Sequence, residues 1–175
     1  MKKINKGQFS YDYFISMIIF ILFVAYIAFQ IMALRPAYLR EVRNEILRSE
    51  SYQLSDLLVN DPGEPLNWDN WDVASVKRIG LSNENVNKTN YLSVAKIVKL
   101  ASLCPQAGYS TSLPQKFGID QKYQFSIIVK NITSGLPLAD CHPSSIIAAR
   151  AINTSIKRVV VLDSGEYGEV TVQMW

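Results

Sequence analysis

The bond between Gly7 and Gln8, followed by a carboxylate at Asp12, is the part of this sequence whose residue types could support chemistry. That chemistry is proteolysis, because a small residue after a short basic head is typical of a leader cleavage point. An uncharged apolar run, residues 13–34, follows Asp12 directly. A secretory signal is cut after its apolar region, whereas a cut here lies before it. We therefore predict that the apolar segment stays in the mature protein.

The junction Lys6-Gly7-Gln8-Phe9-Ser10-Tyr11-Asp12 resembles the class III signal peptide of archaeal type IV pilin-like proteins. The resemblance implies that a prepilin peptidase cuts between Gly7 and Gln8. It also implies that Asp12 takes the place of the acidic residue, usually Glu, that pilins carry there. The partners implied are the peptidase, other pilin-like subunits and a membrane assembly platform. The alternative for Asp12 is an interfacial first-turn acid held by the helix dipole.

A second, looser resemblance links the segments 61–68 and 78–81 to the post-helix region of uncharacterised archaeal proteins of this kind. No function follows from it.

The apolar run has the length of a membrane span. Its roughly 22 residues would extend about 33 Å as a helix, enough to cross a bilayer's hydrocarbon core. A buried helix of a soluble protein is the alternative, and the absence of any charge argues against it. Lysines precede the run and arginines follow it, so the positive-inside rule does not orient it. We place the N-terminus in the cytoplasm on the leader resemblance.

Two features of the remaining chain suit an exterior location. Cys104 and Cys141 form an even pair, and a disulfide between them would close a loop of about 37 residues and contribute roughly 3–4 kcal/mol. Two buried free thiols are the alternative. Glycosylation-type triplets begin at Asn87, Asn131 and Asn153. We predict the disulfide and keep the three asparagines as glycosylation candidates.

The charge balance does not suggest a basic surface for nucleic acid. The chain has 18 basic and 15 acidic side chains, and three of the lysines lie in the leader, so the rest is near neutral. Arginines and glutamates alternate after the apolar run (Arg35, Arg40, Arg43 and Arg48 with Glu41, Glu45 and Glu50). We predict that they form a solvated helix face with mixed ion pairs.

The apolar helix is expected to continue to about Asn60, bent or locally melted near Pro36, and to end at Asp61-Pro62-Gly63. Its predicted apolar stripe consists of Leu39, Val42, Ile46, Leu54, Leu57 and Leu58. Residues 64–75 are predicted to form an ordered loop whose tryptophans, Trp68 and Trp71, cap the core. A helix capped by Asn90 or Ser93 is expected to run to Leu103, with Lys96 and Lys99 off its apolar face.

Beyond residue 121 the apolar period changes to two. Strands are predicted at 123–130, 145–152, 156–162 and 167–175, the last two joined by the turn 163–166. The predicted fold class is α+β: a long N-terminal transmembrane or pilin helix, then a small domain with an antiparallel sheet of about four strands and a short helix. The predicted domains are a leader (1–7), the helix (8–60) and an extracellular domain (61–175).

Catalytic and metal-binding patterns are not found. His142 follows Cys141 directly, and adjacency in sequence does not place a base over a thiol. Asp69, Asn70 and Asp72 have oxygen ligands suited to calcium, but they lack the alternation, the glycine and the distal glutamate of an EF-hand loop. We predict a protein that is not an enzyme and has no cofactor and no metal.

The functional hypothesis is a pilin-like subunit, a minor pilin or pseudopilin, of a type IV pilus-like surface filament. The alternative is a single-pass anchored surface protein that binds or adheres outside the cell without polymerising.

Overall fold

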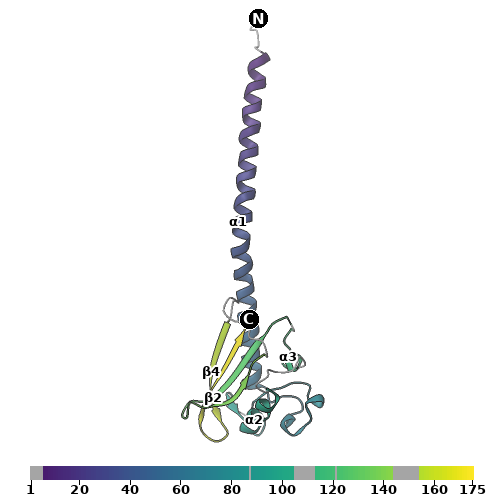
Figure 1. Cartoon of the computed structure of the whole chain (residues 1–175), viewed down its shortest axis with the longest axis vertical. Helices are drawn as coiled ribbons and strands as arrows, with labels where there is room; N and C mark the ends of the chain where they lie inside the picture. Colours follow the sequence, from purple (N-terminus) through teal and green to yellow (C-terminus); the bar gives the residue numbers. More distant parts are fainter. Residues whose placement is uncertain (1–5, 87, 105–112, 121, 144–153) are drawn as a thin grey trace. The chain divides into compact units, whose positions relative to one another are not determined.

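The computed structural model describes residues 6–86, 88–104, 113–120, 122–143 and 154–175, with side chains from Tyr11 onward. The chain forms two compact units, Met1–Arg43 and Asn44–Trp175. Helix α1 (Lys6–Asn60) supplies the described residues of the first unit and the opening turns of the second (Figure 1). The helix assignment continues through Pro36, so no locally melted turn is found there. It ends directly before Asp61-Pro62-Gly63, as predicted.

The second unit begins well before residue 61 because the last turns of α1 supply part of its core. Leu47, Leu54 and Leu58 are buried at helical spacing. Of the predicted stripe, Leu54 and Leu58 are confirmed, whereas Ile46 is 43% exposed and the buried residue is its neighbour Leu47. Two buried serines on this face are satisfied locally. Their hydroxyls donate to helix carbonyls at 2.7 Å (Ser51 to Leu47) and 2.8 Å (Ser55 to Tyr52).

The second unit is built on a sheet with the strand order β1-β4-β5-β2-β3. Pairing is antiparallel except between β1 and β4, which are parallel. The remaining elements, in chain order, are η1 (Trp68–Asn70), η2 (Val73–Ser75), β1 (Tyr91–Leu92), α2 (Val94–Leu103), α3 (Leu113–Lys116), β2 (Phe125–Asn131), β3 (Pro137–Cys141), β4 (Thr154–Leu162) and β5 (Tyr167–Met174). This arrangement confirms the α+β class.

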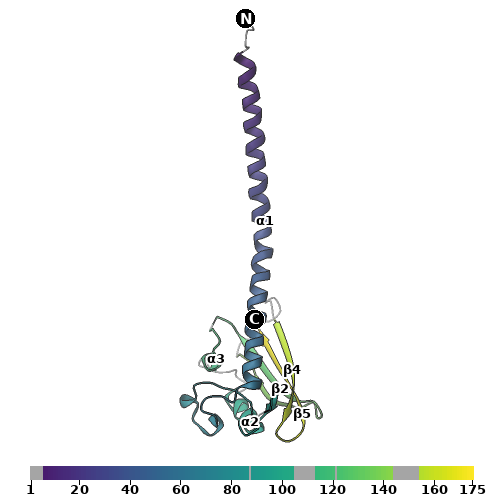
Figure 2. The same cartoon turned by 180° about the vertical axis from the view of Figure 1, so that it is seen from behind.

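One face of the sheet carries the core. Ile127 of β2 lies opposite Val172 of β5 and Cys141 of β3, and the next rows along the strands are equally apolar. Strand alternation places these side chains on a single face. The last turns of α1 pack against that face, as the views from front and back agree (Figures 1 and 2).

The predicted strands 123–130, 156–162 and 167–175 correspond to β2, β4 and β5, and the hairpin at 163–166 is confirmed. The predicted strand 145–152 lies outside the described residues. Strands β1 and β3 and helix α3 were not predicted. Strand β1 has two residues, and β3 begins with proline and carries Asp140, so neither has a strand-like local pattern.

Candidate functional site

The predicted processing and assembly residues lie at the start of α1. Gly7 and Gln8 have helical backbone, and their side chains fall outside the described part of the structure. Asp12 is exposed, and no ion pair or hydrogen bond to its carboxylate is recorded among the described residues. The structure therefore places the carboxylate where a partner from outside the chain can reach it. Cleavage and assembly at these residues stay predictions.

Within the first unit, the described residues leave the apolar run of α1 uncovered. None of its most apolar stretch is buried, and α1 is long and apolar enough to cross a bilayer. The bulky side chains are exposed to between 42% (Ile27) and 71% (Met32) within residues 13–34. Gln30 is the one amide side chain in the run, and its Nε2 donates to the Tyr26 hydroxyl at 3.0 Å.

The arginine-rich segment that follows has no intrahelical ion pairs. Among the described residues, no salt bridge involves an arginine or glutamate of residues 35–50. The predicted mixed ion pairs are therefore wrong. The physical reason is spacing, because residues of opposite charge pair along a helix when they lie three or four positions apart. Only Glu45 and Arg48 meet this condition.

The predicted disulfide between Cys104 and Cys141 is confirmed. Cys104 follows α2 directly, and Cys141 is the last residue of β3. Both sulfurs belong to buried residues on the core side of the sheet. The bond therefore ties the end of α2 to an edge strand, across a sequence separation of 37.

Asn131 is the one glycosylation candidate within the described residues, since Asn87 and Asn153 lie outside them. Its side chain is buried and bonded at both ends. The amide Nδ2 donates to Glu166 Oε2 at 2.6 Å, and Oδ1 accepts the backbone N–H groups of Thr133 (2.8 Å) and Ser134 (3.1 Å). These bonds hold the turn between β2 and β3 and join it to the β4–β5 hairpin. The same nitrogen would have to leave Glu166 to carry a glycan.

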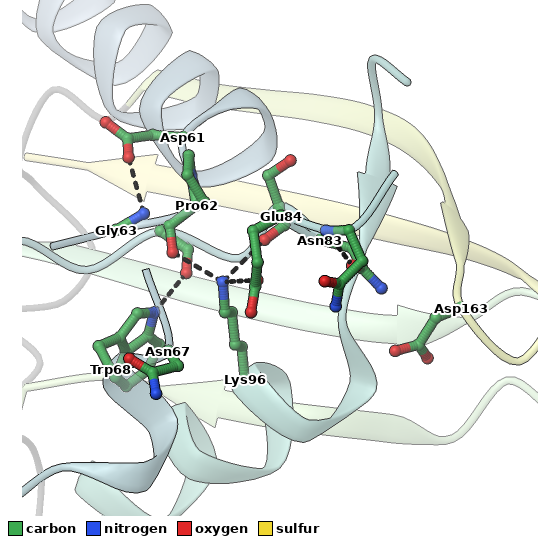
Figure 3. Close-up of polar contacts among 12 residues, drawn as sticks. Asp61, Pro62, Gly63, Asn67, Trp68, Asn83, Glu84, Lys96 and Asp163 are labelled. Carbon is green, nitrogen blue, oxygen red and sulfur yellow. Dashed lines mark hydrogen bonds and ion pairs between the residues drawn. The ribbon is translucent and has the colours of Figure 1, made fainter. Parts of the chain in front are cut away.

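The segments 61–68 and 78–84 fold together into one structure that we call the collar (Figure 3). Asp61 is at its centre. Its Oδ1 accepts the Gly63 N–H at 2.7 Å. Its Oδ2 pairs with Arg78 Nε at 2.8 Å, and its carbonyl accepts the Ser82 N–H at 3.2 Å. The looser sequence resemblance named parts of these two segments, and their contact was not predicted.

Close backbone approach explains two collar glycines. A Cβ on Gly80 would lie 2.0 Å from the Asp61 carbonyl oxygen, and Gly63 has a φ of +89° that favours glycine. The Trp68 indole Nε1 donates to the Gly80 carbonyl at 2.7 Å. Trp68 is fully buried, as predicted for a core cap, whereas Trp71 is 49% exposed and is not.

Lys96 joins α2 to the collar. The prediction that Lys96 lies off the buried face is wrong, because its side chain is 1% exposed. Its Nζ donates to the carbonyls of Pro62 (2.8 Å) and Ser82 (3.0 Å) and to the Glu84 carboxylate (Figure 3). These three hydrogen bonds use all three N–H groups of the lysine ammonium. Helical periodicity cannot reveal these acceptors, since they come from other segments.

The contact with Lys96 affects the pKa of the Glu84 carboxyl. Burial acts to raise its pKa, but the hydrogen bond and charge of Lys96, together with a backbone hydrogen bond, outweigh burial. The pKa of Glu84 therefore lies below its ordinary value of 4.5.

Helix α2 receives its N-terminal cap from a distant turn. Ser93 occupies the N-cap position, yet its side chain makes no capping hydrogen bond. Both carboxylate oxygens of Asp163, in the β4–β5 turn, lie 3.2 Å from the Val94 backbone nitrogen and accept its N–H. An anion at a helix N-terminus is favoured by the free N–H groups and the dipole. The sequence had indicated Asn90 or Ser93 instead.

Arg158 connects the sheet to the last turns of α1. Its Nε donates to Ser55 Oγ at 2.9 Å, and its guanidinium lies 4.8 Å from the ring centre of Tyr52. Its buried Nη2 lies 3.3 Å from Asp56 Oδ1 without hydrogen-bond geometry. These contacts of Arg158 hold the sheet against the last turns of α1, and they do not resemble a reactive site.

A groove of about 800 Å³ runs between the last turns of α1 and the collar. Its lining includes three carboxylates (Asp56, Asp61 and Glu64), and each already has a cationic partner within the chain. Among the described residues, no group of three or more His, Cys, Asp or Glu could hold a metal ion. His142 contacts the Pro143 carbonyl oxygen through Nδ1 at 3.1 Å.

Comparison with known proteins gives a relative from Archaeoglobus fulgidus, described as an uncharacterised protein. It is 30% identical over 138 residues, which cover 72% of this chain and 70% of the relative. The chain belongs to the family of this protein. No family model and no solved structure matches the chain significantly. The long apolar helix followed by a small sheet domain is compatible with a pilin-like architecture.

Proposed function

We propose that this chain is a pilin-like subunit of a type IV pilus-like surface filament, and specifically a minor pilin or pseudopilin. The carrying observation is the apolar run of α1, which the described residues of its own unit leave uncovered and which precedes a separately folded α+β unit. Soluble monomers rarely expose an apolar surface of this extent. The run therefore needs a lipid bilayer or the helices of other subunits around it.

In the proposed pathway, the helix first crosses the membrane with its N-terminus in the cytoplasm and the disulfide-bonded unit outside. A prepilin peptidase cuts between Gly7 and Gln8, and an assembly platform moves the subunit into the filament. The bulky side chains then exchange lipid for protein contacts. This exchange gives little hydrophobic gain because lipid tails are equally apolar, so packing and polar matching must drive it.

Asp12 supplies the polar match. A carboxylate buried alone costs several kcal/mol, and pairing with a cation removes most of that cost. Cleavage creates an α-amino group on Gln8, and the Gln8 amine of a neighbouring copy is the proposed partner. The exposed carboxylate without a recorded partner in the described residues supports this role. The pairing would also set the axial register between neighbours.

The aromatic content of the helix and its arginine-rich continuation favour a minor subunit or pseudopilin over a major one. Nothing in the side chains described here supports a catalytic role or a nucleic-acid partner, and we propose neither.

The proposal is tested by Asp12→Ala, with Asp12→Glu as the matched control. Asp12→Ala should insert in the membrane at the wild-type level and be lost from sheared filament fractions, whereas Asp12→Glu should be incorporated. Mass spectrometry of the filament fraction should find Gln8 as the mature N-terminus. A protein that still begins at Met1, or incorporation of Asp12→Ala at the wild-type level, would contradict the proposal.

A second candidate function is a non-polymerising surface protein anchored by an uncut helix. Its motivating observation is the scarcity of small side chains in the apolar run (Ser16, Ala25, Ala28 and Ala33) and the absence of glycine, which limits close helix approach. An intact leader on the surface-exposed protein would favour this function.

A further inference from the structure

The helical repeat gathers on one face Asp12, which precedes the apolar run, and all the polar side chains of the run except Tyr13. Asp12 and Gln30 are separated by about five full turns, so both point in the same direction from the helix axis. Ser16 and Tyr26 lie within about 40° of that direction. We call these four residues the polar stripe. Tyr13 lies on a different side of the helix.

The stripe has hydrogen-bonding capacity that the chain itself does not use. Gln30 Nε2 donates to the Tyr26 hydroxyl at 3.0 Å, and the described residues record no other hydrogen bond for either side chain. The Gln30 Oε1, one amide N–H and the Tyr26 O–H therefore remain unpaired. Tyr26 lies about 12 Å inside the end of the run at Leu34. Unpaired polar groups at that depth are costly because hydrocarbon offers no hydrogen bonds.

We propose that the polar stripe is a helix–helix interface and that its partner is the stripe of a second copy of this chain in the same membrane. The free groups are self-complementary, because Gln30 Oε1 of one copy can accept a hydrogen bond from the Tyr26 O–H or Gln30 N–H of the other. Ala33 lies one turn beyond Gln30 on the same side and lets the backbones approach there. The stripe deepens the proposed function through Asp12, whereas the Tyr26 and Gln30 contact requires only a bilayer.

Cysteine cross-linking of the uncut full chain tests the interface. The two native cysteines are joined to each other, so an introduced cysteine supplies the one free thiol. Ala33→Cys places that thiol beside the stripe. Met32→Cys places it at nearly the same depth but about 160° around the helix from Gln30. In phosphatidylcholine vesicles treated with copper phenanthroline, Ala33→Cys should form disulfide-linked dimers several-fold faster than Met32→Cys.

Removing the polar groups should abolish this difference. In the Ala33→Cys background, Gln30→Leu and Tyr26→Phe should each slow cross-linking about 3- to 30-fold. Tyr13→Phe removes the same hydroxyl from another side of the helix and should leave the rate unchanged. The inference would be overturned by equal cross-linking rates for Ala33→Cys and Met32→Cys. It would also be overturned if Gln30→Leu left the cross-linking rate of Ala33→Cys unchanged.

The uncut chain makes this result independent of filament assembly. Selective cross-linking of a protein that never enters filaments would support the stripe and contradict the proposed function. Filaments formed by a protein with unselective cross-linking would support the proposed function and overturn the stripe.

Discussion

Lys96 Nζ donates a hydrogen bond to the Pro62 carbonyl at 2.8 Å, across 34 positions of sequence. Pro62 lies just beyond the end of α1, and Lys96 lies in α2, so this bond fixes the helix exit against the domain core. A buried lysine is tolerated here because every N–H finds an acceptor. The contact explains why the collar, although it is mostly loop, has a defined position in the second unit.

Lys96→Met should lower the free energy of unfolding by about 2–3 kcal/mol, because it leaves the acceptors of the ammonium group without their donor. Lys99→Met is the matched control, since Lys99 lies in the same helix and has no recorded ion pair. Urea denaturation of the full chain in detergent measures both. Equal losses in the two variants would show that Lys96 does not hold the collar.

Glu84 should make the second unit less stable in acid. Its pKa is lower in the folded protein than in the unfolded chain, so its contribution is fully present above about pH 4.5 and is lost as pH falls through the folded pKa. Glu84→Gln should lower stability at pH 7 and flatten this part of the pH profile. Denaturant midpoints between pH 2 and 7 provide the measurement, with Glu50→Gln as control. A variant profile parallel to that of the wild type would argue against the Lys96 contact as the cause.

Asp163→Ala should lower the free energy of unfolding by about 1 kcal/mol, the usual cost of losing a helix N-cap. Ser164→Ala, in the same turn, should change it by less than about 0.5 kcal/mol. Ser93→Ala should also have little effect, because the Ser93 side chain makes no capping bond. If Ser93→Ala proved the more damaging change, the cap would belong to Ser93 after all.

Substitutions at Asn131 and Thr133 distinguish a structural role of Asn131 from its glycosylation. Thr133→Ala destroys the glycosylation triplet but keeps the backbone N–H that bonds to Asn131, whereas Asn131→Ala removes the buried amide. We expect Asn131→Ala to cost about 1–3 kcal/mol. Thr133→Ala should leave stability unchanged and should change the mass only by the difference between the two side chains. Mass spectrometry of protein from its native host checks the second point. A glycan lost from Thr133→Ala would show that Asn131 is modified despite its bonds.

Local sequence signals predicted the elements that need only their neighbours. A long apolar stretch without charge predicts α1, the sequence Asp61-Pro62-Gly63 ends it, and the period of two in residues 167–174 predicts β5. The cysteine pair also followed from the sequence, because a chain with two cysteines allows only one internal bridge. The residues for processing and assembly, Gly7, Gln8 and Asp12, came from the sequence alone, and the structure adds only the exposure of Asp12.

Only the tertiary structure decided which residues carry the contacts between elements. Lys96 lies on what periodicity marks as a polar position, and it is buried because its acceptors come from residues 62, 82 and 84. The N-terminal cap of α2 comes from Asp163, 69 positions away. A hydrogen bond between distant segments cannot be predicted from the periodicity of either segment. It depends on the positions that the two segments take in the folded protein. Periodicity and turn residues therefore determined the elements, and long-range hydrogen bonds determined the collar that joins them.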